Sequence, residues 1–133
     1  MLFRSGLTEN TSKEDLFFAF LEAIGCLVRI KVDEMEKEGQ MNIKELMVSG
    51  KLGYSNLLQV VADICQFTVL KHKNDDVNVL GGAFIAGEIS RFWKTETMKK
   101  LKLNHATISP LLDPLSSLVF YNKWIEMTKR WQN

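Results

Sequence analysis

The fold of this chain is best predicted from the stretch Val79-Leu80-Gly81-Gly82-Ala83-Phe84-Ile85-Ala86-Gly87-Glu88-Ile89-Ser90-Arg91-Phe92-Trp93. We expect it to belong to a helix from Val77 to Trp93. Glycine inside a helix costs about 0.5–1 kcal/mol relative to alanine, so Gly81, Gly82 and Gly87 need a reason. Because glycine has no side chain, the side of the helix that carries them leaves the backbone uncovered. This predicts that a flat ligand or another element, such as a strand in close packing, approaches the helix backbone.

The composition describes one ordinary globular domain. The chain has 133 residues, 46% of them hydrophobic and 25% charged, with a net charge of +1. This charge argues against nucleic acid as a partner, and no apolar run approaches the ~18–20 residues of a membrane span. Cys26 and Cys65 lie in apolar runs without metal-ligand spacing, so we interpret them as reduced core residues of a cytoplasmic protein.

The spacing of apolar residues predicts four helices. They span residues 12–37, 55–66, 77–93 and 114–131. Thr11 and Glu14 fit a capping box ahead of the first helix, which should stop at Gly39. Asp113 followed by Pro114 is typical of the start of the last helix.

Two short buried strands are predicted between these helices, at 43–48 and 67–70. Strands that alternate with helices favour an α/β fold in which helices pack on a short, mostly parallel sheet. Two strands alone are marginal. We therefore expect residues 1–133 to be part of a larger domain whose other strands lie upstream.

Several motifs, in the correct order, resemble the C-terminal domain of the FGGY carbohydrate kinases, with the glycerol kinases as the nearest group. The resemblance covers roughly residues 6–131, and its main motifs are Gly6-Leu7-Thr8, Leu21-Glu22-Ala23-Ile24-Gly25, Ala62-Asp63-Ile64 and Leu80–Trp93. It implies an incomplete ribonuclease-H-like, actin-like ATPase domain. The N-terminal domain of that family would then be absent from the chain.

The loop after the first strand resembles the family's D-G-G turn, whose glycine amides lie beside the nucleotide. Two alignments are open. One places the glycine pair at Ser49-Gly50 and the family's asparagine at Tyr54; the other places the pair at Gly50-Lys51. In both, one glycine and the acidic residue are replaced. The resemblance thus implies a degenerate nucleotide site of Ser49, Gly50, Lys51, Tyr54, Gly81 and Gly82, and no catalytic or metal-ligating residue.

The implied function is the nucleotide-binding part of an ATP-dependent, glycerol-kinase-like phosphotransferase. ATP and Mg²⁺ are the implied cofactors, a small polyol or sugar is the implied substrate, and a homo-oligomer is compatible with the family. We expect the chain to be inactive alone, because the catalytic base and acceptor site of the family lie upstream. The alternative is a non-catalytic relative that serves as a scaffold or regulatory partner, or a truncated gene product.

The remaining polar candidates have structural interpretations. Asp63 should cap or pair within the fold, because a buried charge needs a partner. Asp76 should act on the dipole of the helix that follows it. His72 and His105 are expected in polar, solvated loops. Aromatic residues of the last helix should pack in the core, and they are Phe120, Tyr121, Trp124 and Trp131.

Overall fold

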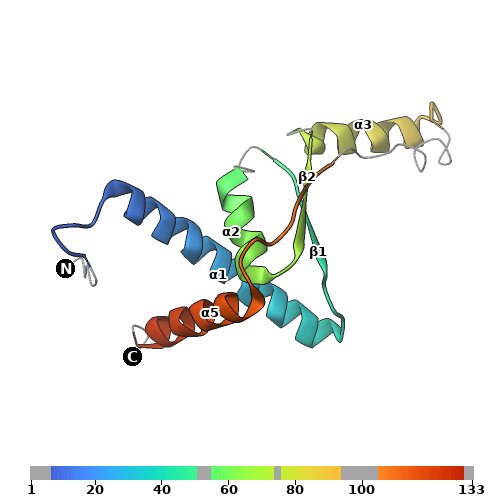
Figure 1. Ribbon diagram of the computed structural model, residues 1–133. Coiled ribbons are helices and arrows are strands. Elements are labelled where there is room, and N and C mark those ends of the chain that lie inside the picture. The colour runs from blue at the N-terminus through green and yellow to red at the C-terminus, as the bar shows by residue number, and fades with distance from the viewer. Residues whose placement is uncertain (1–6, 51–54, 74–75, 94–104, 131–133) are drawn as a thin grey trace.

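The computed structural model describes residues 7–50, 55–73, 76–93 and 105–130. The elements follow in the order α1 (Lys13–Gly39), β1 (Glu45–Val48), α2 (Ser55–Cys65), β2 (Thr68–His72), α3 (Val77–Ile89), β3 (His105–Ile108) and α5 (Pro114–Lys129). Figure 1 shows α1, α2 and α5 gathered at one side of the sheet, while α3 extends away from them. The predicted helices are confirmed, although α3 and α5 end earlier than expected.

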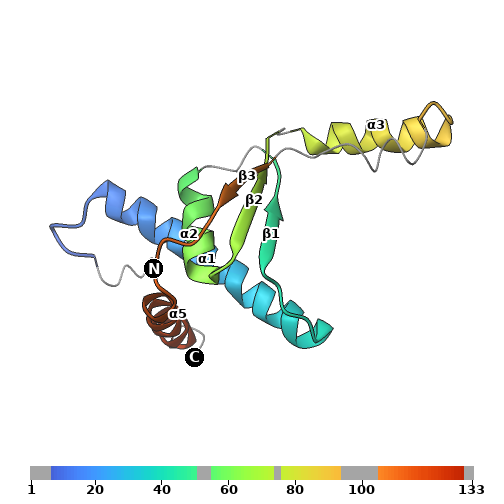
Figure 2. The same cartoon turned by 45° about the vertical axis from the view of Figure 1, so that its right-hand side comes forward.

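The sheet has three strands in the order β1-β2-β3. β1 and β2 are parallel, with Glu45 opposite Thr68, and α2 forms the crossover between them. β3 is antiparallel to β2, with Val69 opposite Ile108. The α/β class and both predicted strands are therefore confirmed. The third strand was not predicted, and it makes the sheet mixed where a mostly parallel one was expected. Figure 2 shows β3 lying against β2 at the edge of this mixed sheet.

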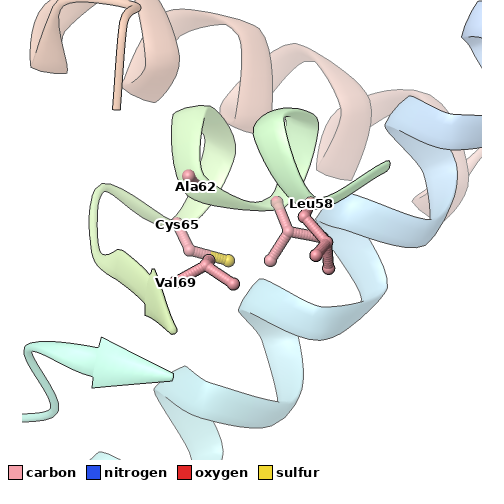
Figure 3. Close-up of a cluster of buried hydrophobic side chains, with 5 residues drawn as sticks. Leu58, Ala62, Cys65 and Val69 are labelled. Atoms are coloured by element: carbon pink, nitrogen blue, oxygen red, sulfur yellow. The ribbon is translucent and has the colours of Figure 1, made fainter. Parts of the chain in front are cut away.

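One face of the sheet is covered by α2 and forms the main core. Its buried residues come from α2 and the middle of β2, and they are Leu58, Val61, Ala62, Cys65 and Val69. Figure 3 shows these side chains between α2 and β2, with α1 alongside. Val69 and Ala62 have no exposed surface. Because successive strand residues point to opposite faces, β2 can fill this core with only every second residue.

A glycine in α1 allows α1 and α2 to approach each other closely. A Cβ built on Gly25 would lie 2.7 Å from Ile64 Cδ1 and 3.3 Å from Val60 Cγ1 of α2. An added Cβ would therefore force the side chain of Ile64 to shift. The close approach that glycine permits is therefore found between α1 and α2.

A polar network holds α5 against α1 and α2. Arg29 donates to the Ile64 carbonyl at 2.6 Å, and the buried Ser117 hydroxyl donates to the same oxygen at 3.0 Å. The guanidinium of Arg29 also lies over the Tyr121 ring, 4.3 Å from its centre. Tyr121 then donates to Asp33 at 3.1 Å. Phe120, Tyr121 and Trp124 pack in the second core cluster as predicted, while Trp131 lies outside the described residues.

The caps of α1 differ from the prediction by one residue. Ser12 accepts from the Asp15 amide, and Asp15 accepts from the Ser12 amide, so the capping box is formed by this pair and not by Thr11 and Glu14. The chain leaves α1 through Gln40 in the left-handed conformation. At α5, Asp113 caps the Ser116 amide and Pro114 takes the first position, as expected.

Candidate functional site

The candidate site lies where β1 and β2 end. Parallel strands bring their carboxyl ends to one edge of a sheet, and ligands of open α/β sheets bind at that edge. Ser49 and Gly50 follow β1, and His72 is the last residue of β2. α3 begins shortly after β2, so its first turns start from the same edge (Figure 1).

A cavity of about 310 Å³ opens between this edge and the first turns of α3. Its lining comes from β1, the residue after β1, the end of β2, and α3, and consists of Met47, Ser49, His72, Val77, Leu80, Gly81 and Phe84. The volume falls at the small end of the range for ligand sites. Mainly apolar walls suit a flat, largely uncharged ring better than a phosphate.

Ser49 and Gly81 are the two predicted site residues that the structure brings together in this cavity. Gly82 is next to Gly81 but is not among the cavity's lining residues, and a Cβ at either glycine would meet no atom within 4 Å. Close packing of these two glycines on a strand is therefore not what the described residues show. Lys51 and Tyr54 lie outside the described residues.

Gly50 has a backbone conformation that only glycine adopts easily. Its φ is +100°, and a Cβ there would meet no atom within 4 Å. The requirement is thus conformational and not a matter of crowding. Both alignments of the loop place a family glycine at Gly50, so its conformation agrees with either.

Gly87 has a local role. A Cβ on Gly87 would lie 2.5 Å from Cε3 of Trp93, because the chain folds back over the end of α3. The Trp93 amide donates to the Gly87 carbonyl at 3.1 Å, and Phe84 packs edge-on against the Trp93 ring. The third glycine of the stretch is therefore explained by this turn, and the prediction that α3 continues to Trp93 was wrong.

The prediction that both histidines lie in polar, solvated loops was wrong. His72 ends β2 with 7% of its surface exposed, and His105 begins β3 directly opposite it. β3 was missed because it contains only four residues, although His105-Ala-Thr-Ile108 carries the β-branched residues typical of a strand. His105 was therefore predicted in a loop. His72 was predicted in a loop because the second strand was expected to end at residue 70, whereas β2 continues to His72.

The other polar candidates have the expected structural roles where the structure describes them. Asp63 accepts from the amides of Leu111 and Leu112 at 2.5 and 3.0 Å, so it anchors the segment before α5. Asp76 is the N-cap residue of α3, at the positive end of the helix dipole, and its side chain makes no capping hydrogen bond. Cys26 and Cys65 are buried and free, and burial raises the pKa of their thiols to about 11 and about 12.

A larger cavity of about 520 Å³ lies elsewhere, between α1 and the start of α2. Its walls are mainly apolar and include Phe17, Phe20 and Leu57. It contains none of the predicted site residues. In the described ranges, no group of three or more His, Cys, Asp or Glu residues could hold a metal ion. None of the helices there is both long and apolar enough to cross a membrane.

Comparison with known sequences decides the family. The profile of the C-terminal domain of the FGGY carbohydrate kinases matches residues 2–88. The chain belongs to this family. Glycerol kinase from Streptococcus agalactiae serotype Ia is 40% identical over 103 residues, which are 77% of this chain and 20% of that protein. Glycerol kinase from Streptococcus pneumoniae strain 70585 is 33% identical over 129 residues, or 96% of this chain and 26% of that protein.

Solved structures of FGGY kinases have the same fold as this chain. The crystal structure of Plasmodium falciparum glycerol kinase with ADP superimposes with a TM-score of 0.81 at 22% identity, over 94% of this chain and 26% of that one. Xylulose kinase from Rhodospirillum rubrum gives 0.66 at 17% identity, over 96% and 27%. The actin-like ATPase fold is thus confirmed. This FGGY chain spans about a fifth to a quarter of the length of its relatives.

Proposed function

We propose that this chain is the nucleotide-binding C-terminal part of a glycerol-kinase-like, ATP-dependent polyol phosphotransferase. One observation carries the proposal: Ser49 after β1 and Gly81 of α3, both assigned to the nucleotide by family resemblance, line one cavity. Relatives 33–40% identical are named glycerol kinases, and one structural neighbour was solved with ADP. Both facts support ATP and a small polyol as substrates of the complete enzyme.

The cavity fits the base of the nucleotide better than its phosphates. Met47, Leu80 and Phe84 supply apolar surface for a flat ring, and Ser49 and His72 supply polar groups. Among the described lining residues there is no lysine or arginine to pair with phosphate. We therefore assign the ring to this cavity, with Gly50 presenting its backbone beside it. The described lining residues include no carboxylate either, so Mg²⁺ would enter with the phosphates.

The chain alone should not transfer a phosphoryl group. Phosphoryl transfer needs the nucleotide, the acceptor and a base held in one geometry. In the FGGY family the base and the acceptor contacts lie upstream of the segment that this chain resembles. Glycerol-dependent ATP consumption by the purified chain is therefore expected to be absent. Measurable turnover would contradict this part of the proposal.

Nucleotide binding is tested by titrating the ¹⁵N-labelled chain with Mg²⁺–ADP. We expect the amide signals of Ser49, Gly50 and Gly81 to shift together and to saturate. The amide of Cys26, in the core between α1 and α2, serves as the internal control and should not move. Shifts confined to residues around the larger cavity, or no shifts, would overturn the assignment.

A non-catalytic relative is the second candidate, and the altered loop favours it. Val48 or Ser49 stands where the family has its aspartate, and a serine or a lysine replaces one glycine of the pair. A chain that stays folded but gives no saturable shift with Mg²⁺–ADP would support a scaffold or regulatory role over nucleotide binding.

A further inference from the structure

His72 and His105 face each other across two antiparallel strands. They are a directly opposed pair in the ladder between β2 and β3. Side chains of such a pair lie on the same face of the sheet, with Cβ atoms about 4.5–5.5 Å apart. The chain contains two histidines in total, so both of its imidazoles lie at adjacent positions in the sheet.

The core fixes which face the two rings occupy. Val69 of β2 and its partner Ile108 of β3 belong to the core covered by α2. Each histidine lies three residues from one of these core residues, and side chains alternate between faces. Both imidazoles therefore lie on the opposite face, at the edge where the cavity opens. His72 is 7% exposed and His105 is exposed, so one ring lies deep and the other faces solvent.

We propose that His72 and His105 form a two-histidine binding site for a borderline transition-metal ion such as Zn²⁺, Ni²⁺ or Cu²⁺. Imidazole nitrogens suit these ions and bind Zn²⁺ at about 2.0–2.1 Å. Each ring uses one nitrogen for the metal, and the other nitrogen can keep a hydrogen-bond partner, as it does in most protein sites. Water fills the remaining positions on the ion. The hard ion Mg²⁺, which prefers oxygen, does not bind here.

The two cysteine thiols do not compete for the ion. Cys26 and Cys65 are both buried, on the side of the sheet that faces the helices. Burial holds both thiols in the protonated form at neutral pH, and a metal needs the thiolate. The proposal does not depend on nucleotide binding, because the metal alone is its probe.

The test is calorimetric titration of the tag-free chain with Zn²⁺, together with ¹⁵N spectra of the two histidine rings during addition of Ni²⁺. We expect one ion per chain, broadening of both rings at the same Ni²⁺ concentration, and no heat with Mg²⁺. His105→Asn should weaken Zn²⁺ binding by at least about tenfold, since even the outer contacts of metal ligands are worth that much.

His105→Asn is the informative variant because residue 105 is exposed and the substitution spares the core. His72→Asn is added to remove the buried ligand, and circular dichroism checks that it folds. Broadening of the His105 ring alone would overturn the proposal, and so would Zn²⁺ affinity that is unchanged in His105→Asn. A failure of nucleotide binding would leave the metal result unaffected.

Discussion

Ser49 and Gly81 line the same cavity although the whole of α2 and β2 lies between them in the sequence. The parallel crossover makes this meeting necessary. β1 and β2 end at one edge, and α3 starts from that edge, so Ser49, directly after β1, faces the first turns of α3. Resemblance to the FGGY kinases predicted both residues at the nucleotide. The pairing of β1 with β2 explains why they lie close together.

Replacing Gly50 should destabilise the fold through its backbone alone. At φ +100°, Gly50→Ala adopts a strained conformation, and we expect a loss of about 1–2 kcal/mol in the free energy of unfolding. Gly50→Asn should lose less, because asparagine tolerates positive φ better than alanine does. Urea unfolding measures both variants. Equal losses for alanine and asparagine would show that the backbone conformation is not the cause.

The contact between Gly25 and Ile64 predicts a coupling between the two positions. A glycine-to-alanine change inside a helix normally gains up to about 1 kcal/mol. At Gly25 the new Cβ would lie 2.7 Å from Ile64 Cδ1, so this gain should be lost. Ile64→Val removes Cδ1, and in that background Gly25→Ala should regain at least about 0.5 kcal/mol. Urea unfolding of the four variants gives the coupling, and a value near zero contradicts the contact.

Much of the fold was accessible from sequence because α1, α2 and α5 carry apolar faces and because capping signals mark the starts of α1 and α5. β3 was not, because four residues give too little periodicity and the strand depends on β2 for its pairing. The strand residues that line the cavity, Met47 and His72, were missed for the same reason. Which strand residues face a site follows from register, and register is set by the partner strand.

Asp63 should matter for stability and not for catalysis. Asp63→Ala removes the acceptor for the Leu111 and Leu112 amides, and we expect a loss of about 1–2 kcal/mol. Asp63→Asn keeps a carbonyl oxygen at the same position and should lose less. Thermal or urea unfolding separates the two variants. A fully stable Asp63→Ala chain would contradict the anchoring role.

Stability should fall at alkaline pH. Burial raises the pKa of the Cys65 thiol from 9.0 to about 12, and burial together with Asp33 raises the pKa of Tyr121 from 10.0 to about 12. Both groups bind their protons more tightly when folded. Their contribution is therefore complete below pH 9 and is lost as pH rises toward 12. Unfolding free energies measured between pH 7 and 11 test this.

Cys65→Ala is the matched control for the alkaline effect. It removes the thiol with the larger shift, so its stability should start lower but decline less steeply above pH 9 than that of the parent chain. An identical slope in the two chains would assign the alkaline loss to other groups.

The assignment of the nucleotide to the cavity lined by Ser49 and Gly81 is tested most directly by ADP binding in equilibrium dialysis with Mg²⁺. The parent chain is compared with two neighbouring variants, Gly81→Leu and Gly82→Leu. Both changes replace a helical glycine of α3 with no atom within 4 Å of the new Cβ, but only Gly81 lines the cavity. We expect saturable ADP binding by the parent chain and by Gly82→Leu. Gly81→Leu should bind ADP at least about tenfold more weakly, a loss of some 1.4 kcal/mol in binding free energy. Equal binding by both variants, or no binding by the folded parent chain, would contradict this assignment.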